Sequence, residues 1–271
     1  MTDNINNVET AIKNGKFKVI SRPIIPIEDL KVGDYLSSYH FADSAVYARI
    51  LKSIDKVSYS GKVLVVSVDN NIVRLTPDND CLVRYRCREN DHCVYVMKKG
   101  KAFRVGMSKI WHEDNGCGPY KRLVEESGDE SWILGIFPSR RHALLEEAKV
   151  SIRFRLPQTM FSYKEGRGSW TQEEFDDVWG EVDNYEDAKK ALEYYNRDIN
   201  YPYFDRSKLH TSIKRPHVVK ACNILKNSEM FIRNKKWMNI DISEDTYEGD
   251  IYKLIVDKDN NYFLNNILIK N

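Results

Sequence analysis

The sequence lacks the segments that mark membrane and secreted proteins. No apolar run reaches the length of a transmembrane helix, and residues 1–4 do not have the pattern of a signal peptide. The five cysteines are an odd number without a CxxC pair, which argues against a disulfide framework or a zinc site. We therefore expect a cytoplasmic protein with reduced thiols and no membrane partner.

The sequence also lacks a strong excess of charge of either sign. Its 42 basic and 40 acidic residues give a formal net charge of +2, and 42% of the 271 residues are hydrophobic. A chain of this length and composition can bury more than one core, so we expect about two to three small domains.

Two strands and a tight turn are indicated in the middle of the chain. Residues 93–97 and 102–106 alternate like half-buried strands, and Gly100 lies between them at a turn. The pattern predicts a hairpin that carries Tyr95.

A helix and a third strand are predicted next. Pro119 is tolerated in the first turn of a helix, and the helix that it opens carries Lys121 and Arg122. Residues 132–137 form an apolar run of strand length, which predicts a buried strand.

A longer helix is expected after Ser139, which can cap it. Leu145, Ala148 and Ile152 supply apolar residues at helical spacing and predict the buried face of this helix. Glu147 lies off that stripe.

The order of these elements resembles the GIY-YIG nuclease family. Residues 93–95 lie where the family has its first tripeptide, and residues 104–106 lie where it has the second. Residues 143–147 resemble its glutamate helix. The resemblance implies a ββαβα nuclease domain over residues 89–165.

The resemblance also implies a set of catalytic roles. Hydrolysis of a phosphodiester puts charge on a five-coordinate phosphorus. A divalent ion held by a carboxylate and a cationic side chain can stabilise this charge, and a phenol can position or deprotonate the attacking water. Glu147 would be the ligand of Mg²⁺ or Mn²⁺, Arg122 the clamp on the scissile phosphate, and Tyr95 the group that orients or activates water. Lys109 and Lys121 are auxiliary candidates for binding DNA.

Three departures from the family pattern leave a second hypothesis open. The second tyrosine of the family falls on Arg104, or on Phe103 if the register slips, although Arg104 could still bind phosphate. No asparagine stands near Gln158 or Thr159, where the family has one, and residues 110–118 are an insertion that the alignment must bridge. The alternative is a DNA-binding protein that has lost catalysis.

Both ends of the chain predict antiparallel strands, at residues 27–34, 62–68, 72–77, 249–256 and 262–269. These ends resemble the two halves of a Hint fold. Residues 27–34 and 76–79 resemble N-terminal intein blocks, and residues 252–271 resemble the last two. An endonuclease between such halves is the layout of a large intein.

The residues that splicing needs are replaced at several positions. In the block that contains Thr76, Asn79 stands in place of a histidine, and an amide cannot exchange a proton near neutral pH. Asn271 fits the asparagine that cyclises, but Lys270 precedes it instead of histidine, and no cysteine precedes Cys81. We expect a Hint-like scaffold without splicing, and an intein with residual self-cleavage is the alternative.

Charge is segregated in the second half of the chain. Residues 206–236 are basic and have aromatic residues in and beside them, and residues 217–226 are helix-like. This combination predicts a DNA-recognition module. A solvated basic helix is the alternative interpretation. Residues 173–187 are acidic and predict a helix face turned from DNA, and residues 166–169 predict a linker. The candidate DNA contacts in the basic segment are Lys214, Arg215, Lys220 and Lys226.

Together these patterns predict an α+β protein. An all-β Hint-like scaffold would be built from residues 1–88 and 237–271, with the nuclease domain at 89–165 and the basic region at 166–236. The expected function is a homing-type, metal-dependent endonuclease that cleaves double-stranded DNA.

Overall fold

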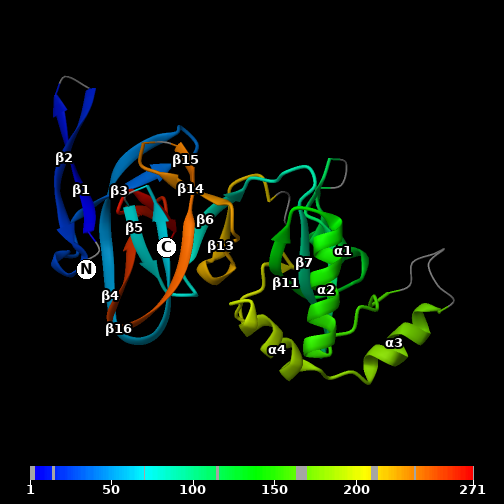
Figure 1. The fold of residues 1–271 in the computed structure, drawn as a ribbon. Helices are drawn as coiled ribbons and strands as arrows, with labels where there is room; N and C mark the ends of the chain where they lie inside the picture. Colours follow the sequence, from blue (N-terminus) through cyan, green and yellow to red (C-terminus); the bar gives the residue numbers. More distant parts are fainter. Residues whose placement is uncertain are drawn as a thin grey trace. The chain divides into compact units, whose positions relative to one another are not determined.

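The computed structural model describes residues 4–13, 16–69, 71–113, 116–162, 170–208, 213–234 and 236–270. The chain divides into two compact units (Figure 1). Met1–Arg84 and Val218–Asn271 form the first, here called the β unit, and Tyr85–His217 form the second, the inserted unit. Residues 166–236 were expected as one region. The boundary between the two units falls after His217 and divides this region.

Strands make up 47% of the chain and helices 21%, which confirms an α+β composition. No helix in the described ranges is long and apolar enough to cross a membrane. The five cysteines all lie in the described ranges, and none of them forms a disulfide bond.

Twelve strands of the described chain contribute to the two larger sheets of the structure. One sheet has the order β16-β4-β3-β1-β2, with β5 on β4, and the other has the order β13-β6-β14-β18-β17, with β15 on β14. Their bounds are β1 Asn4–Lys13, β2 Lys16–Pro26, β3 Tyr35–His40, β4 Ala45–Val68, β5 Asn71–Leu75, β6 Asp80–Tyr85, β13 His217–Lys220, β14 Ser228–Ile232, β15 Lys236–Asn239, β16 Asp241–Val256, β17 Asn261–Leu264 and β18 Ile267–Lys270.

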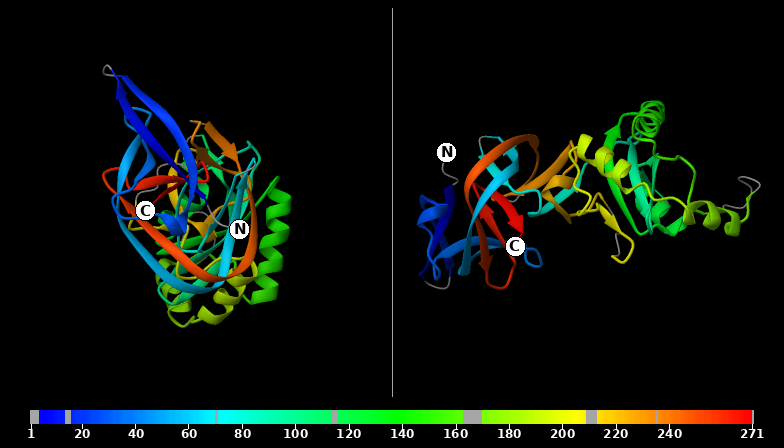
Figure 2. Two further views of the ribbon diagram at one scale, coloured as in Figure 1. Left: turned by 90° about the vertical axis from the view of Figure 1, so that its left-hand side faces the viewer. Right: turned by 90° about the horizontal axis from the view of Figure 1, so that it is seen from below.

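A long antiparallel ribbon dominates the β unit. β4 has 24 residues and β16 has 16, and the two strands pair from Leu51 with Val256 to Ser67 with Asp241. They curve side by side in all views (Figures 1 and 2). The strands predicted from residue 62 to 77 and from residue 249 to 269 are confirmed as parts of β4, β5, β16, β17 and β18.

The strand predicted over residues 27–34 is wrong. Ile27–Asp29 form a 3-10 helix, η1, and the chain then turns at Gly33, whose φ is +99°. The Asp34 carboxylate closes this turn by accepting from the backbone N–H of Lys31 at 2.8 Å. A local side-chain acceptor and a glycine in the left-handed region therefore override the alternating pattern.

The helix predicted over residues 217–226 is also wrong. The segment forms β13, which pairs with β6, and then a 3-10 helix, η2, at Ala221–Asn223. The backbone N–H groups of Ala221 and Cys222 donate to the carbonyl oxygens of Asn79 and Pro77 at 2.8 and 3.1 Å. Pairing with distant backbone therefore replaces the local bonds of an α-helix.

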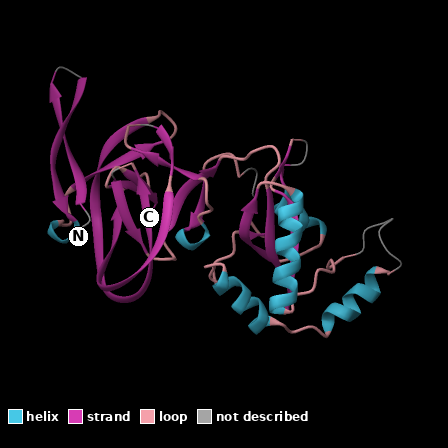
Figure 3. Ribbon diagram, in the orientation of Figure 1, coloured by secondary structure: helices cyan, strands magenta, loops and turns pink. Residues whose placement is uncertain are grey.

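The inserted unit has one antiparallel sheet, in the order β12-β11-β7-β8, and a short β9–β10 pair. The α-helices of the described chain all belong to this unit (Figure 3). The predicted hairpin, third strand and helices are confirmed. The bounds are β7 His92–Lys99, β8 Ala102–Lys109, β9 Trp111–His112, β10 Gly116–Cys117, α1 Gly118–Glu125, β11 Glu130–Phe137, α2 Arg140–Phe154, α3 Gln172–Gly180, α4 Tyr185–Tyr194 and β12 Phe204–Asp205.

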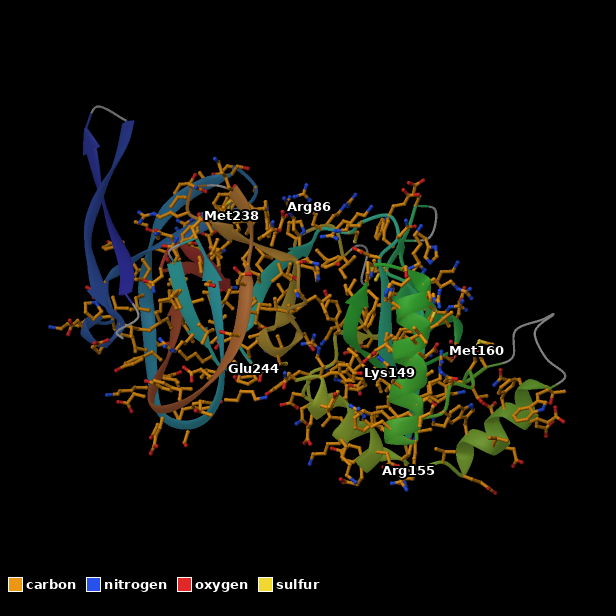
Figure 4. The ribbon with its side chains drawn as sticks, in the orientation of Figure 1. Arg86, Lys149, Arg155, Met160, Met238 and Glu244 are labelled. Atoms are coloured by element: carbon orange, nitrogen blue, oxygen red, sulfur yellow. The ribbon has the colours of Figure 1, made fainter. Side chains whose placement is uncertain are left out.

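The buried face of α2 differs from the predicted one. Leu145 is 55% exposed and Ile152 is 82% exposed, whereas Ala143 and Val150 are buried in the core of the inserted unit. Because Glu147 lies one turn after Ala143, it is half-buried rather than on a solvated flank. Lys149 and Arg155, labelled in Figure 4, mark the later part of this helix and its carboxyl end.

Candidate active site

Tyr95 lies in the centre of the sheet of the inserted unit. It pairs with Gly106 of β8 on one side and with Ile133 of β11 on the other. Its side chain is only 1% exposed. Successive side chains of a strand point to opposite faces, so Tyr95 does not share the face that Val94 and Val96 present to the core below α2.

Arg104, which the sequence pattern aligns with the second family tyrosine, lies beside Tyr95. Its Nη2 donates to the hydroxyl oxygen of Tyr95 at 3.2 Å. Phe103 packs instead on Trp132, with ring centroids 6.1 Å apart, in the core of the inserted unit. Phe103 therefore packs in the core with Val94 and Val96, and Arg104 is the residue that contacts the Tyr95 hydroxyl.

Glu126 joins this pair and was missed in the sequence. Its Oε1 accepts from Arg104 Nη2 at 2.5 Å, and its Oε2 accepts from the backbone N–H of Phe161 at 3.1 Å. Arg104 and Glu126 are each 3% exposed, so the ion pair is buried. One signal in the sequence could have indicated Glu126. It follows Arg122 by four positions, which is one helical turn, so the two side chains are expected on the same face of the helix.

The Arg104 guanidinium is held on several sides. Its Nη1 donates to the carbonyl oxygens of Val105 at 3.0 Å and Gln158 at 3.5 Å, while its buried Nε finds no partner in the described ranges. Burial lowers the pKa of Arg104, but Tyr95 and Glu126 outweigh this effect and raise the pKa above its usual value. The group therefore stays charged. Gln158, near the position expected for the family asparagine, contributes its backbone to this contact.

The surroundings of Tyr95 keep its phenol neutral at pH 7. Burial raises the pKa of Tyr95 to about 12, although the charges of Arg104 and Arg122 act in the opposite direction. Glu126 adds to the rise. These effects place Arg122, the expected phosphate clamp, within electrostatic range of the Tyr95 hydroxyl.

The insertion before α1 is bridged by direct contact between β8 and the helix. The backbone N–H of Gly118 donates to the carbonyl oxygen of Ile110 at 3.1 Å. A Cβ atom at position 118 would lie 1.9 Å from the carbonyl oxygen of Lys109, so only glycine allows this approach. The first turn of α1 is therefore held against the end of β8, and Arg122 follows in the next turn of this helix.

Basic side chains gather around the start of α1. Burial lowers the pKa of His112, and the charges of Lys109, Lys121 and Arg122 lower it further. On α1 itself, Glu125 pairs with Arg122 at 3.3 Å and with Lys121 at 3.6 Å. The auxiliary basic residues expected from the sequence therefore lie in one region.

Glu147 lies on α2, and among the described residues the one charged group that affects its pKa is Arg104. Burial raises the pKa of its carboxyl above the usual value, and the charge of Arg104 and the backbone N–H of Met107 act in the opposite direction. The neighbouring Glu146 is already engaged, because its carboxylate accepts from Tyr195 at 2.5 Å and from Lys149 at 3.1 Å. Of these two adjacent carboxylates, Glu147 is the one whose pKa the charge of Arg104 lowers.

Glu147 is the one carboxylate that the sequence pattern assigns to a metal ion. The described ranges contain no group of three or more side chains that would enclose a metal ion. Magnesium commonly keeps several waters and binds through one or two carboxylates plus substrate phosphate. One half-buried carboxylate beside basic residues is compatible with that mode of binding.

The Hint-like residues lie together in the β unit. Thr76, Asn79 and Lys270 line one cavity of about 860 Å³. Asn79 Oδ1 accepts from both the backbone N–H and the hydroxyl of Thr76, each at 2.8 Å. Asn271 lies outside the described residues.

The four expected DNA contacts do not form one helix. Lys214 and Arg215 belong to the inserted unit, whereas Lys220 and Lys226 belong to the β unit. Lys220 pairs with Asp80 at 2.9 Å, and the side chains of Arg215 and Lys226 are exposed. α3 and α4 confirm the helices expected in the acidic segment, and the expected linker at 166–169 lies outside the described residues.

No family model matches the chain, and no curated protein matches its sequence.

Proposed function

We propose that this protein is a homing-type DNA endonuclease that hydrolyses phosphodiester bonds with one divalent metal ion. The observation that carries the proposal is the hydrogen bond between Arg104 and Tyr95, together with the effects of nearby charges on the pKa values of Tyr95 and Glu147. Arg104 donates a hydrogen bond to Tyr95, the charge of Arg122 lowers the pKa of Tyr95, and the charge of Arg104 lowers the pKa of Glu147. Four separate elements, β7, β8, α1 and α2, supply these side chains in the ββαβα order of a GIY-YIG nuclease.

The charged residues have complementary tasks in this proposal. Glu147 would hold Mg²⁺ or Mn²⁺, which supplies charge neutralisation at the phosphoryl oxygens when bound. Arg122 is partly exposed and its guanidinium can bind two oxygens of the scissile phosphate. Lys109 and Lys121 raise the local positive charge that attracts the DNA backbone.

Tyr95 would act on the attacking water. In hydrolysis an oxygen–phosphorus bond forms to water and the bond to the leaving oxygen breaks. One proton passes from the attacking water to solvent, and the leaving oxygen takes one from solvent. A phenol whose pKa is raised to about 12 stays protonated at pH 7, so it orients water by hydrogen bonding rather than removing its proton.

The position of the inserted unit supports the homing assignment. The β unit is built from both ends of the chain, and the inserted unit lies between them in sequence, as in a large intein. The Hint-like identity of the β unit is part of the proposal, and so is action on double-stranded DNA in the cytoplasm. We propose that splicing is lost, because Asn79 uses its side-chain oxygen to cap Thr76.

A plasmid-nicking assay tests the proposal. Supercoiled plasmids that carry cognate genomic fragments would be incubated with the full chain and Mg²⁺ or Mn²⁺, with EDTA as the metal-free control. We expect metal-dependent nicking that Tyr95→Phe lowers by about 10²-fold and that the matched exposed-site variant Tyr35→Phe leaves unchanged. Normal nicking by Tyr95→Phe would rule out the assigned role.

A second candidate function is DNA binding without cleavage. It is favoured by the burial of Tyr95 and Arg104, which are 1% and 3% exposed. In that case the protein would shift DNA in a gel but would not nick any fragment with either metal.

A further inference from the structure

Arg104 makes the Tyr95 hydroxyl an acceptor on one side. A phenol has one O–H donor and acceptor lone pairs, and a guanidinium can only donate. Since Arg104 Nη2 donates to the Tyr95 oxygen at 3.2 Å, the proton of Tyr95 must point elsewhere. Across the described ranges, Arg104 is the one residue hydrogen-bonded to this hydroxyl, so the O–H has no acceptor among the described residues.

Glu126 prevents the Arg104 guanidinium from turning away. Its two carboxylate oxygens bond to Arg104 and to the backbone of Phe161, so the carboxylate is itself fixed. The guanidinium carbon also lies 5.7 Å from the Tyr95 ring centroid and 5.9 Å from that of Phe161. A buried ion pair needs hydrogen bonds of this kind to offset the loss of hydration, although Arg104 Nε remains unpaired in the described ranges.

We propose that the Arg104–Glu126 pair fixes the Tyr95 hydroxyl as a hydrogen-bond donor, with Glu126 as a positioning residue that acts through Arg104. The inference rests on the proposed nuclease function. It also couples the hydroxyl to α1, because Glu126 ends that helix and its backbone N–H donates to the carbonyl oxygen of Arg122 at 3.0 Å.

The pair predicts opposite electrostatic effects of its two members. The charged or titratable groups that face Tyr95 are Arg104 on β8, Arg122 and Glu126 on α1, and Cys93 on β7. Arg104→Gln removes a positive charge and should raise the titration midpoint of Tyr95. Glu126→Gln removes a negative charge and should lower it, each by about one unit.

Fluorine NMR measures these midpoints without any requirement for cleavage. 3-Fluorotyrosine would be incorporated at position 95 alone in the full chain, and its fluorine shift followed against pH. The matched control is Glu130→Gln, which removes a carboxylate that pairs with Lys98 at 2.9 Å on the same sheet and should leave the midpoint unchanged. The double variant Arg104→Gln/Glu126→Gln should return close to the parent value and should also show whether the fold tolerates loss of the pair.

Nicking rates then test the positioning role. Arg104→Gln and Glu126→Gln should each lower the rate about tenfold or more in the parent but have little further effect in a Tyr95→Phe background. The inference would be overturned if the titration midpoint of Tyr95 did not move in either variant. It would also be overturned if the losses of nicking rate were additive with the loss caused by Tyr95→Phe. Midpoints that shift in opposite directions in a protein that nicks no DNA would uphold the pair and refute the nuclease function.

Discussion

Gly106 lies directly opposite Tyr95 across β7 and β8, and this glycine makes room for the tyrosine ring. A Cβ atom at position 106 would lie 2.8 Å from the Tyr95 hydroxyl oxygen and 2.8 Å from Arg104 Nη1. Both distances are shorter than packed side chains adopt. The glycine is therefore required by the site rather than by a backbone turn.

Gly106→Ala should displace the site without unfolding the protein. The atoms that the new methyl group meets are the far ends of side chains, which can shift, so we expect a folded protein with Tyr95 and Arg104 moved apart. A misplacement of about 1 Å in a catalytic group costs about 10²-fold in rate. Nicking assays and circular dichroism would measure the two effects, with Gly180→Ala as the control because nothing lies within 4 Å of its added methyl group.

Removal of the Glu147 carboxylate should abolish metal-dependent cleavage but not DNA binding. Glu147→Gln keeps the size of the side chain and removes its charge, so metal affinity should fall and nicking should drop by roughly 10²–10³-fold. Nicking with titrated Mn²⁺ and gel-shift affinity would be measured together. Glu146→Gln is the matched control, since Glu146 is engaged by Tyr195 and Lys149. If Glu147→Gln cuts normally while Glu146→Gln does not, the ligand assignment moves by one residue.

Local signals in the sequence were sufficient for much of the inserted unit. Gly100, with φ of +59°, turns the hairpin, and Pro119 stands in the first turn of α1. Ser139 caps α2 by accepting from the backbone N–H of His142. Each of these features depends on residues within a few positions of one another.

Features that depend on distant contacts were not predictable in the same way. Helical spacing alone did not show that Ala143 rather than Leu145 would face the sheet, because small residues allow closer packing. The segment after His217 became a strand through pairing with β6. Glu126 has no sequence signal that identifies Arg104 as its partner, since 22 positions separate them.

The salt dependence of DNA binding should separate the basic residues. Arg215 and Lys226 are exposed, and each should reduce the slope of log K against log salt by roughly 0.9 unit when replaced by alanine, if it contacts a phosphate. Lys220→Ala should change the slope less, because its ammonium group pairs with Asp80. Fluorescence anisotropy at several salt concentrations would measure the slopes. An unchanged slope in the triple variant of these residues would contradict a DNA-binding role for this segment.

Asp259 should stabilise the β unit in a pH-dependent way. Burial raises the pKa of its carboxyl, but hydrogen bonds from Arg49, His40 and Ser38 outweigh burial and leave the pKa below its usual value. A carboxyl with a lowered pKa stabilises the fold above its unfolded pKa of about 4, and this stabilisation is lost as the pH falls through the folded value.

Asp259→Asn should therefore lower the free energy of opening of the β unit at pH 7 by about 1.5–3 kcal/mol and have a smaller effect at pH 3. Hydrogen exchange of peptides from β3 and β17 would report this opening locally. Asp250→Asn is the control, because Asp250 pairs with Lys56 at 2.8 Å and both side chains are exposed. Equal losses at the two pH values would show that the charge of Asp259 is not what stabilises the fold.

The β unit should not cleave a peptide bond at its amino end, even when foreign sequences flank it and a cysteine is placed ahead of its first strand. Amide cleavage by an acyl shift needs a group that protonates the leaving nitrogen, and an asparagine cannot exchange a proton near neutral pH. The oxygen of Asn79 is also occupied by two bonds from Thr76, so it is a cap of that turn.

Asn79→His, alone and with Lys270→His, is the informative gain-of-function test, because positions 76, 79 and 270 already line one cavity. A histidine at 79 would supply a proton donor and acceptor at the place where the scissile amide would lie. Intact mass spectrometry over several days would detect released flanking peptide. We expect no released peptide from the chain with Asn79 and slow release from the Asn79→His variant. Cyclisation of Asn271 is the one step that is available to both chains. A ligated flank product from the unmodified chain would show that the β unit still splices and that its Hint-like residues have been misassigned.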